Sequence, residues 1–135
     1  MNLTDIAKKV FADDRYATEL TGAEIAAMGE HEATCTLTIN ADHCNARGVA
    51  MGGALYTLAD FCAAVAANSD LQAPLQWVSL DATIHYLAPV QAGTVLTAHA
   101  TALKHGRTTA LYQTIIESLD SGKRIAIVET SMVKV

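Results

Sequence analysis

The sequence lacks the patterns that mark several large classes of protein. Its three cysteines, Cys35, Cys44 and Cys62, form no Cys-x-x-Cys pair and are odd in number, so neither a disulfide framework nor a zinc site is expected. No Gly-x-Ser-x-Gly elbow, P-loop or Rossmann glycine pattern is present. The formal net charge of −5 argues against a nucleic-acid partner, which would select a basic surface.

Long apolar runs and linkers are missing as well. The longest apolar stretch is interrupted by Asp60 and is too short to span a bilayer, so no membrane association is expected. The N-terminus carries acidic Asp5, Asp13 and Asp14, unlike a signal peptide. No repeat and no Pro/Gly/Ser-rich linker divides the chain, which predicts one domain over residues 1–135. We therefore expect a cytosolic protein, a compartment that also suits free cysteines.

What the sequence does have is an excess of apolar residues. Hydrophobic residues make up 51% of the chain and charged residues only 17%. A chain of this size buries roughly two-thirds of its unfolded surface, and a monomer normally has more charge on the remainder. The composition therefore predicts a buried interface between subunits, in a homodimer or homotetramer.

Helical spacing appears in two places. Apolar residues at 3–11 recur with a helical period, with Thr4 as a possible N-cap, and predict a helical segment at residues 1–18. Residues 52–69 are rich in alanine and leucine and are apolar on every face. A helix of that kind must be surrounded, and a sheet is the simplest wrapper.

The remaining segments alternate with a period of two, as strands do. Residues 33–39 are apolar at odd positions, and Glu24–Met28 would pair with them in a hairpin that turns near Gly29. Further strands are expected at 78–86, 94–104, 108–118 and 124–134, joined in part by short glycine-containing turns. The predicted fold is α+β, a curved antiparallel sheet of about six strands around a long central helix.

Asp60 is the most informative single residue. It is the only formally charged side chain between Gly52 and Asn68, in an apolar helix. Because burying an unpaired carboxylate is costly, Asp60 must be hydrogen-bonded, raised in pKa or turned towards a wet cleft. The alternatives are a functional carboxylate and a structural one that bonds a neighbouring strand.

A second feature is Met51-Gly52-Gly53 at the start of that helix. Free backbone N–H groups at a helix N-terminus can polarise a carbonyl oxygen, and glycine admits a close approach; paired glycines also simply make tight turns. Gly52 and Asp60 lie ~12 Å apart along one helix, too far to act on one carbon. Two copies of the helix related by a two-fold axis would bring Gly52 of one chain beside Asp60 of the other, which predicts two equivalent sites at a dimer interface.

These residues also carry a family resemblance. The stretch from Asn45 to Gly53 followed by Leu58-Ala59-Asp60 resembles the Asn-x-x-Gly-x-x-His-Gly-Gly…Leu-x-Asp signature of phenylacetic-acid-degradation-type hotdog thioesterases. Residues 78–81, 86–89 and 105–107 are similar to later segments of that family. The resemblance implies a hotdog fold and hydrolysis of acyl-CoA thioesters, with CoA as part of the substrate and no other cofactor.

The resemblance also implies roles for individual positions. Asp60 would be the nucleophile or the general base, and the Gly52 N–H would polarise the thioester carbonyl. Asn45 would orient water or the carbonyl, unless it only serves the turn. Gly53 would lie against the substrate, and Ser79 would line the site, unless it only belongs to the polar face of a strand.

One position departs from the signature, because Met51 stands where the family has histidine. Methionine fills space but donates no hydrogen bond and carries no proton. If the histidine only positions the turn, activity survives; if it polarises the thioester, this chain is slow, altered in substrate or a binder. The rival interpretations are a non-catalytic acyl-CoA-binding hotdog protein and a hotdog enoyl-CoA hydratase.

A small basic cluster lies at a predicted hairpin. Lys104, His105 and Arg107 stand out in an acidic chain and would bind the phosphates of CoA, or else form an ordinary solvated turn. No histidine has metal-ligand spacing, so no metal site is expected. Cys62 lies two residues after Asp60 and is interpreted as a core thiol.

Overall fold

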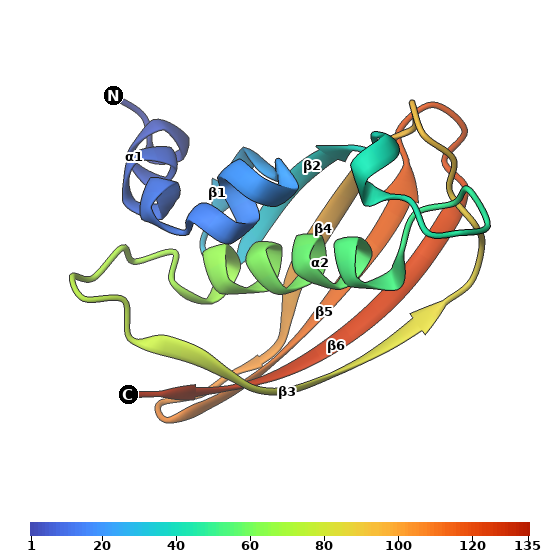
Figure 1. Ribbon diagram of the computed structural model, residues 1–135. Helices are drawn as coiled ribbons and strands as arrows, with labels where there is room; N and C mark the ends of the chain where they lie inside the picture. The colour runs from blue at the N-terminus through green and yellow to red at the C-terminus, as the bar shows by residue number, and fades with distance from the viewer.

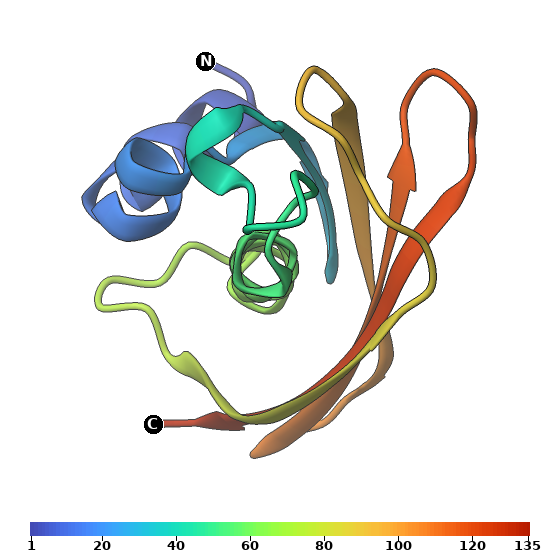
Figure 2. The same ribbon diagram turned by 45° about the vertical axis from the view of Figure 1, so that its right-hand side comes forward.

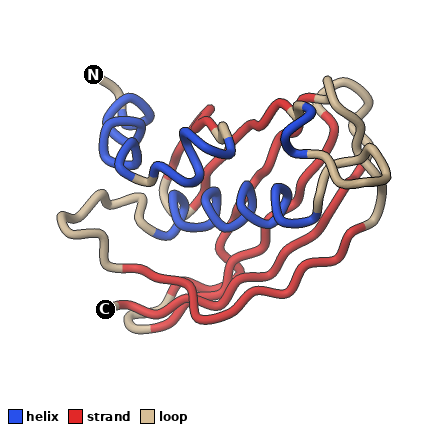
Figure 3. The backbone as a smooth tube through the Cα atoms, viewed as in Figure 1, coloured by secondary structure: helices blue, strands red, loops and turns tan.

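A six-stranded antiparallel sheet curves around one long helix in the computed structural model, which describes residues 1–135 (Figure 1). The helix is α2 (Gly52–Ala67), and the sheet order is β1-β2-β4-β5-β6-β3. The strands are β1 (Glu24–Gly29), β2 (Glu32–Thr38), β3 (Trp77–Tyr86), β4 (Val95–His105), β5 (Thr109–Ser118) and β6 (Arg124–Lys134). Figure 3 shows that the strands run diagonally across the helix. The α+β hotdog fold expected from the sequence is confirmed.

Helix α2 is the centre of the core. Leu58, Cys62 and Val65 are completely buried, and the helix is apolar on all sides, as a helix enclosed by a sheet must be. Its end is attached to β3 through Asn68, which accepts a hydrogen bond from the Trp77 N–H (3.0 Å) and donates one to the Trp77 carbonyl (3.2 Å). The helix ends at Ala67, two residues before the expected boundary.

The N-terminal segment covers the open side of the helix and of β1 (Figure 2). It consists of α1 (Leu3–Val10), a 3₁₀ turn at Phe11–Asp13 and a π-helical turn at Tyr16–Thr21. The prediction of Thr4 as N-cap was wrong. Asn2 caps α1 instead, because its backbone is extended and its side chain accepts a hydrogen bond from the Asp5 N–H at 2.9 Å.

Strand β3 lies at one edge of the sheet and contains a β-bulge. Its pairing with β6 shifts between Ser79 and Asp81, so Leu80 is an extra residue. A bulge reverses the alternation of side chains, and the strict alternation expected for 78–86 is therefore interrupted. Strict alternation would place Ser79 on the face of β3 opposite to Ala82 and Tyr86. In the structure Ser79 lies on the same face as these two residues and points to α2.

No helix of the structure has both the length and the apolar character that a membrane crossing requires.

Candidate active site

The loop before α2 is held by its own side chains. Buried His43 bonds the carbonyl of Thr21 through Nε2 (2.7 Å) and accepts the Asn40 N–H through Nδ1 (3.0 Å). The Met51 N–H in turn donates to the His43 carbonyl at 2.8 Å. The N-terminal segment, the loop and the start of α2 therefore form one hydrogen-bonded unit, which fixes where the helix begins.

Asn45 serves the turn of this loop. Its Oδ1 accepts hydrogen bonds from the Arg47 N–H (2.9 Å) and the Val49 N–H (3.4 Å). Both accepting contacts stay within the loop, whereas its amide NH₂ group donates to no protein atom. The turn-forming role considered from the sequence is thus present, and one pair of donors remains available for a ligand.

Two free N–H groups lie at the start of α2. Neither Gly52 nor Gly53 donates a backbone hydrogen bond, whereas the Ala54 N–H already bonds the Met51 carbonyl at 3.0 Å. No side chain caps the helix, since Met51 occupies the N-cap position and is 56% exposed. The free donors and the positive end of the helix dipole point to one place, which suits a polarised carbonyl oxygen.

Asp60 is paired with Ser79. The Ser79 hydroxyl donates a hydrogen bond of 3.0 Å to Oδ1 of Asp60. Asp60 itself is half-buried, so it is neither sealed in the core nor free in solvent. It keeps a second carboxylate oxygen with no partner in the chain, which is the atom available for chemistry.

A second carboxyl group lies near this pair. Asp14 follows the 3₁₀ turn of the N-terminal segment, where Phe11 packs edge-on against Phe61 with ring centroids 5.9 Å apart. Partial burial raises the pKa of Asp14, and repulsion by the Asp60 carboxylate raises it further. The sequence analysis did not connect Asp14 with Asp60, because the contact depends on how the N-terminal segment packs on α2.

The basic hairpin lies at the other end of the strands from Gly52. Lys104 and Arg107 are exposed, but His105 is not an ordinary solvated residue. Its ring stacks on His31 at 3.7 Å, and its Nδ1 lies 2.7 Å from the Tyr112 hydroxyl. Burial lowers the pKa of His105, and the neighbouring His31 lowers it further, so His105 adds little positive charge for binding phosphates.

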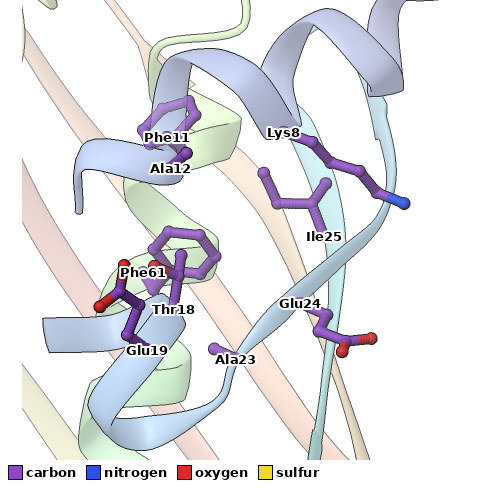
Figure 4. A pocket seen from close by; sticks show the side chains of 9 residues that line it. All are labelled: Lys8, Phe11, Ala12, Thr18, Glu19, Ala23, Glu24, Ile25 and Phe61. Atoms are coloured by element: carbon purple, nitrogen blue, oxygen red, sulfur yellow. The ribbon is translucent and has the colours of Figure 1, made fainter. Parts of the chain in front are cut away.

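Two cavities bear on the interpretation. One of about 370 Å³ opens beside Gly52 and is lined by Leu55, Tyr86 and Val90 among others. The largest, about 470 Å³, lies between the N-terminal segment, β1 and α2, with Phe11 and Phe61 on one side and the Lys8 amine pointing away (Figure 4). No cavity is lined by both Gly52 and Asp60.

Comparison with known proteins decides the family. Residues 47–125 match the family described as the thioesterase superfamily. The chain belongs to the thioesterase superfamily. The matched residues of this superfamily include Met51, Gly52, Asp60 and Ser79, but the match begins after Asn45 and excludes the N-terminal segment.

Individual members of the superfamily agree with this assignment. The acyl-coenzyme A thioesterase PaaI of Escherichia coli is 36% identical over 106 residues, which is 78% of this chain and 73% of that protein. The mouse acyl-coenzyme A thioesterase 13 is 29% identical over 128 residues, 93% of this chain and 89% of that protein. The solved structure of E. coli PaaI superposes with a TM-score of 0.86 at 27% identity, covering 99% of this chain and 96% of that one.

The structure groups the predicted site residues of this thioesterase-superfamily chain into three sets. It brings Asp60 and Ser79 together, and it places Met51, Gly52 and Gly53 at the helix start with Asn45 in the preceding loop. It leaves Lys104, His105 and Arg107 far from Gly52, at the end of the sheet where the His105 ring lies 4.5 Å from that of Trp77. Sequence reasoning gave no role to Tyr86, whose hydroxyl lies against Gly52, although Tyr86 begins the segment 86–89 that is similar to the family.

Proposed function

We propose that this chain hydrolyses acyl-CoA thioesters to a free acid and CoA, at two equivalent sites in a homodimer interface. The observation that carries the proposal is that one face of α2 has hydrogen-bond donors at its start and a carboxylate further along. Gly52 offers unpaired N–H donors, and Asp60, two helical turns later, offers a carboxylate oriented by Ser79. The names of the E. coli and mouse relatives, both acyl-coenzyme A thioesterases, support this substrate class.

The edge strand β3 supports the dimer. Its outer side has unpaired backbone groups, and its apolar side chains are uncovered: Leu80 is 63% exposed, Val78 43% and Tyr86 52%. An edge with exposed apolar residues is a ready surface for strand pairing. Pairing β3 with a second β3 would continue the sheet and bury these side chains.

One two-fold axis would serve both halves of the site. Gly52 and Asp60 are symmetric about position 56 of α2, and their strand neighbours Tyr86 and Ser79 are symmetric about the bond between Ala82 and Thr83 in β3. An axis through these two midpoints places Gly52 and Tyr86 of one subunit opposite Asp60 and Ser79 of the other. The ~12 Å that separates Gly52 from Asp60 within a chain is then no obstacle.

The chemistry follows from these groups. The thioester carbonyl oxygen accepts the Gly52 N–H, which stabilises the negative charge that develops on it. The partner's Asp60 either attacks the carbonyl carbon or takes a proton from water that attacks it. The C–S bond breaks, the electron pair leaves with the CoA sulfur, and water supplies the oxygen of the acid and the proton of the thiol.

The same dimer would bring the basic hairpin to the site. The hairpin lies at the Trp77 end of β3, and Gly52 lies at the Tyr86 end. Antiparallel pairing of two β3 strands places Lys104 and Arg107 of one subunit near Gly52 of the other, where the CoA phosphates are bound. Met51, Gly53 and the free amide of Asn45 line the approach to the thioester.

A cytosolic location fits this function. The thiols of Cys35, Cys44 and Cys62 are free, and reduced thiols are typical of the cytosol, where acyl-CoA esters are available.

The first test is release of free CoA from a panel of aryl and aliphatic acyl-CoA esters. We expect turnover in the wild type and a loss of at least about 100-fold in Asp60→Asn, which keeps the shape and the Ser79 contact but removes the charge. Tight binding of the esters without CoA release would instead identify a non-catalytic binder, the role that Met51 favours because it offers no donor. Modification of an enoyl chain with the thioester intact would identify a hydratase.

Subunit complementation tests the shared site. Gly52→Pro removes the N–H at the first position of the helix, and its ring also displaces Tyr86, so both effects fall on the same half of the site. Homodimers of Gly52→Pro and of Asp60→Asn each lack a complete site, whereas a mixed dimer has one intact site and one doubly mutated site. Random exchange should therefore restore about a quarter of the wild-type rate. No recovery after verified subunit exchange contradicts a site shared between subunits.

A further inference from the structure

The hydroxyl of Tyr86 lies against the first residue of α2. A Cβ atom added to Gly52 would meet Oη of Tyr86 at 2.6 Å and Cζ at 2.7 Å. Only glycine therefore fits under this ring without moving it. The contact connects the end of the edge strand β3 directly to the free N–H groups of the helix.

The Tyr86 hydroxyl lies on the wall of a cavity and has no partner within the chain. Oη makes no hydrogen bond in the chain, although the unpaired N–H groups of Gly52 and Gly53 belong to the same helix terminus. The ring is 52% exposed and forms one wall of the cavity of about 370 Å³. The other walls are apolar and include Leu55 and Val90. Ligand cavities are mostly apolar and have a few polar groups that orient the ligand, and a free hydroxyl on this wall suits that role.

The side chains that flank Gly52 and Gly53 in the sequence offer no donor. Met51 precedes Gly52 and has only a thioether, and Ala54 follows Gly53. Two donors on one oxyanion are the usual arrangement for acyl transfer, because a carbonyl oxygen has two lone pairs. At this helix start, the N–H groups of Gly52 and Gly53 are the backbone donors, and the Tyr86 O–H, which lies against Gly52, is placed to add a side-chain donor.

We propose that Tyr86 is a catalytic residue whose hydroxyl donates a second hydrogen bond to the thioester carbonyl oxygen, beside the Gly52 N–H. The inference rests on the proposed thioester hydrolysis. The bond strengthens as the oxygen gains charge in the transition state, so its effect falls on kcat more than on KM. Glycine at position 52 then has two roles: its N–H is a donor, and its missing side chain lets the tyrosine hydroxyl approach.

Kinetics of Tyr86→Phe give the first test. This variant keeps the ring and loses only the hydroxyl. We expect kcat to fall by about 10- to 100-fold, at the lower side of the loss for a single oxyanion donor, with KM nearly unchanged. Thr38→Val removes a hydroxyl from an exposed position at the end of β2 and should leave both constants unchanged. Unchanged kcat in Tyr86→Phe overturns the inference and leaves the proposed hydrolysis intact if Asp60→Asn is still inactive.

A spectroscopic readout separates donation from packing. Benzoyl-CoA and hexanoyl-CoA labelled with ¹³C at the carbonyl are bound to Asp60→Asn, and isotope-edited infrared spectra report the C=O stretch. Hydrogen bonds to the oxygen lower this frequency. We expect the C=O stretch to lie at a higher frequency in Asp60→Asn/Tyr86→Phe than in Asp60→Asn. Calorimetry should show that both variants bind the esters with similar affinity.

The two proposals fail in different ways in this experiment. An identical C=O frequency in both variants overturns the role of Tyr86, whatever the kinetics show. A Tyr86-dependent frequency in the Asp60→Asn background, together with a wild type that releases no CoA, supports the hydrogen bond and contradicts hydrolysis. Absence of ester binding overturns both.

Discussion

Ser79 reaches Asp60 because of the extra residue that follows it in the strand. The Ser79 hydroxyl donates to the Asp60 carboxylate at 3.0 Å, from a strand that shifts its register between Ser79 and Asp81. Without the bulge at Leu80, Ser79 would face away from the helix whenever Tyr86 faces it. One inserted residue thus places Ser79, which bonds the Asp60 carboxylate, and Tyr86, whose hydroxyl lies near Gly52, on the same side of β3.

Removing the Ser79 hydroxyl should weaken catalysis without unfolding the protein. Hydrogen bonds to charged groups contribute about 1.5–3 kcal/mol, which corresponds to a fall in kcat of about 10- to 100-fold for Ser79→Ala if the bond orients the reacting carboxylate. Ser79→Thr retains the hydroxyl and suits a strand, so it should recover most of the rate. CoA-release kinetics with thermal melts measure both; equal rates in Ser79→Ala and wild type would show that the bond is only structural.

A charge on the edge strand should separate the subunits. Leu80 is highly exposed in the single chain, and Leu80→Glu would bury a carboxylate against a second β3. We expect light scattering to show a monomer and CoA release to be lost. Leu119→Glu, at a similarly exposed leucine of the β5–β6 connection, should remain a dimer and active. A fully active Leu80→Glu monomer contradicts the interface.

Mild acid should destabilise the fold through His105. The pKa of His105 is lowered by burial and by His31, so the folded state prefers the neutral ring. As pH falls below the unfolded value of about 6.5, the unfolded state takes up the proton first, and stability is lost until the lower folded pKa is passed. Urea unfolding at pH 7.5 and 5.5 measures the loss of unfolding free energy on acidification, which should be smaller for His105→Asn than for the wild type. An unchanged difference would show that another group titrates.

Restoring a donor at position 51 should accelerate the reaction. Met51 is exposed at the N-cap, so an imidazole has room and lies next to the Gly52 N–H. We expect Met51→His to raise kcat several-fold, since a hydrogen bond to the carbonyl oxygen would be added, whereas Met51→Leu should match the wild type. The pH dependence of kcat in the histidine variant provides the check. Identical rates in all three proteins would show that position 51 only shapes the turn.

The amino-acid sequence by itself determined the elements and the isolated carboxylate. Period-two alternation predicted the strands within about two residues, glycine-containing turns predicted the hairpins, and the apolar residues 52–69 predicted an enclosed helix. These signals are local, because the backbone geometry of a strand or helix sets the spacing of its buried side chains. The unusual position of Asp60 was visible for the same reason, as one charge in an apolar helix.

Only the tertiary structure decided which side chains meet. The bulge at Leu80 depends on the pairing of β3 with β6, and it brought Ser79 to Asp60 against the alternation pattern. The approach of Tyr86 to Gly52 and the stacking of His105 on His31 join residues distant in sequence. Such contacts follow from strand register and from the packing of a whole helix on a sheet, which no local period encodes.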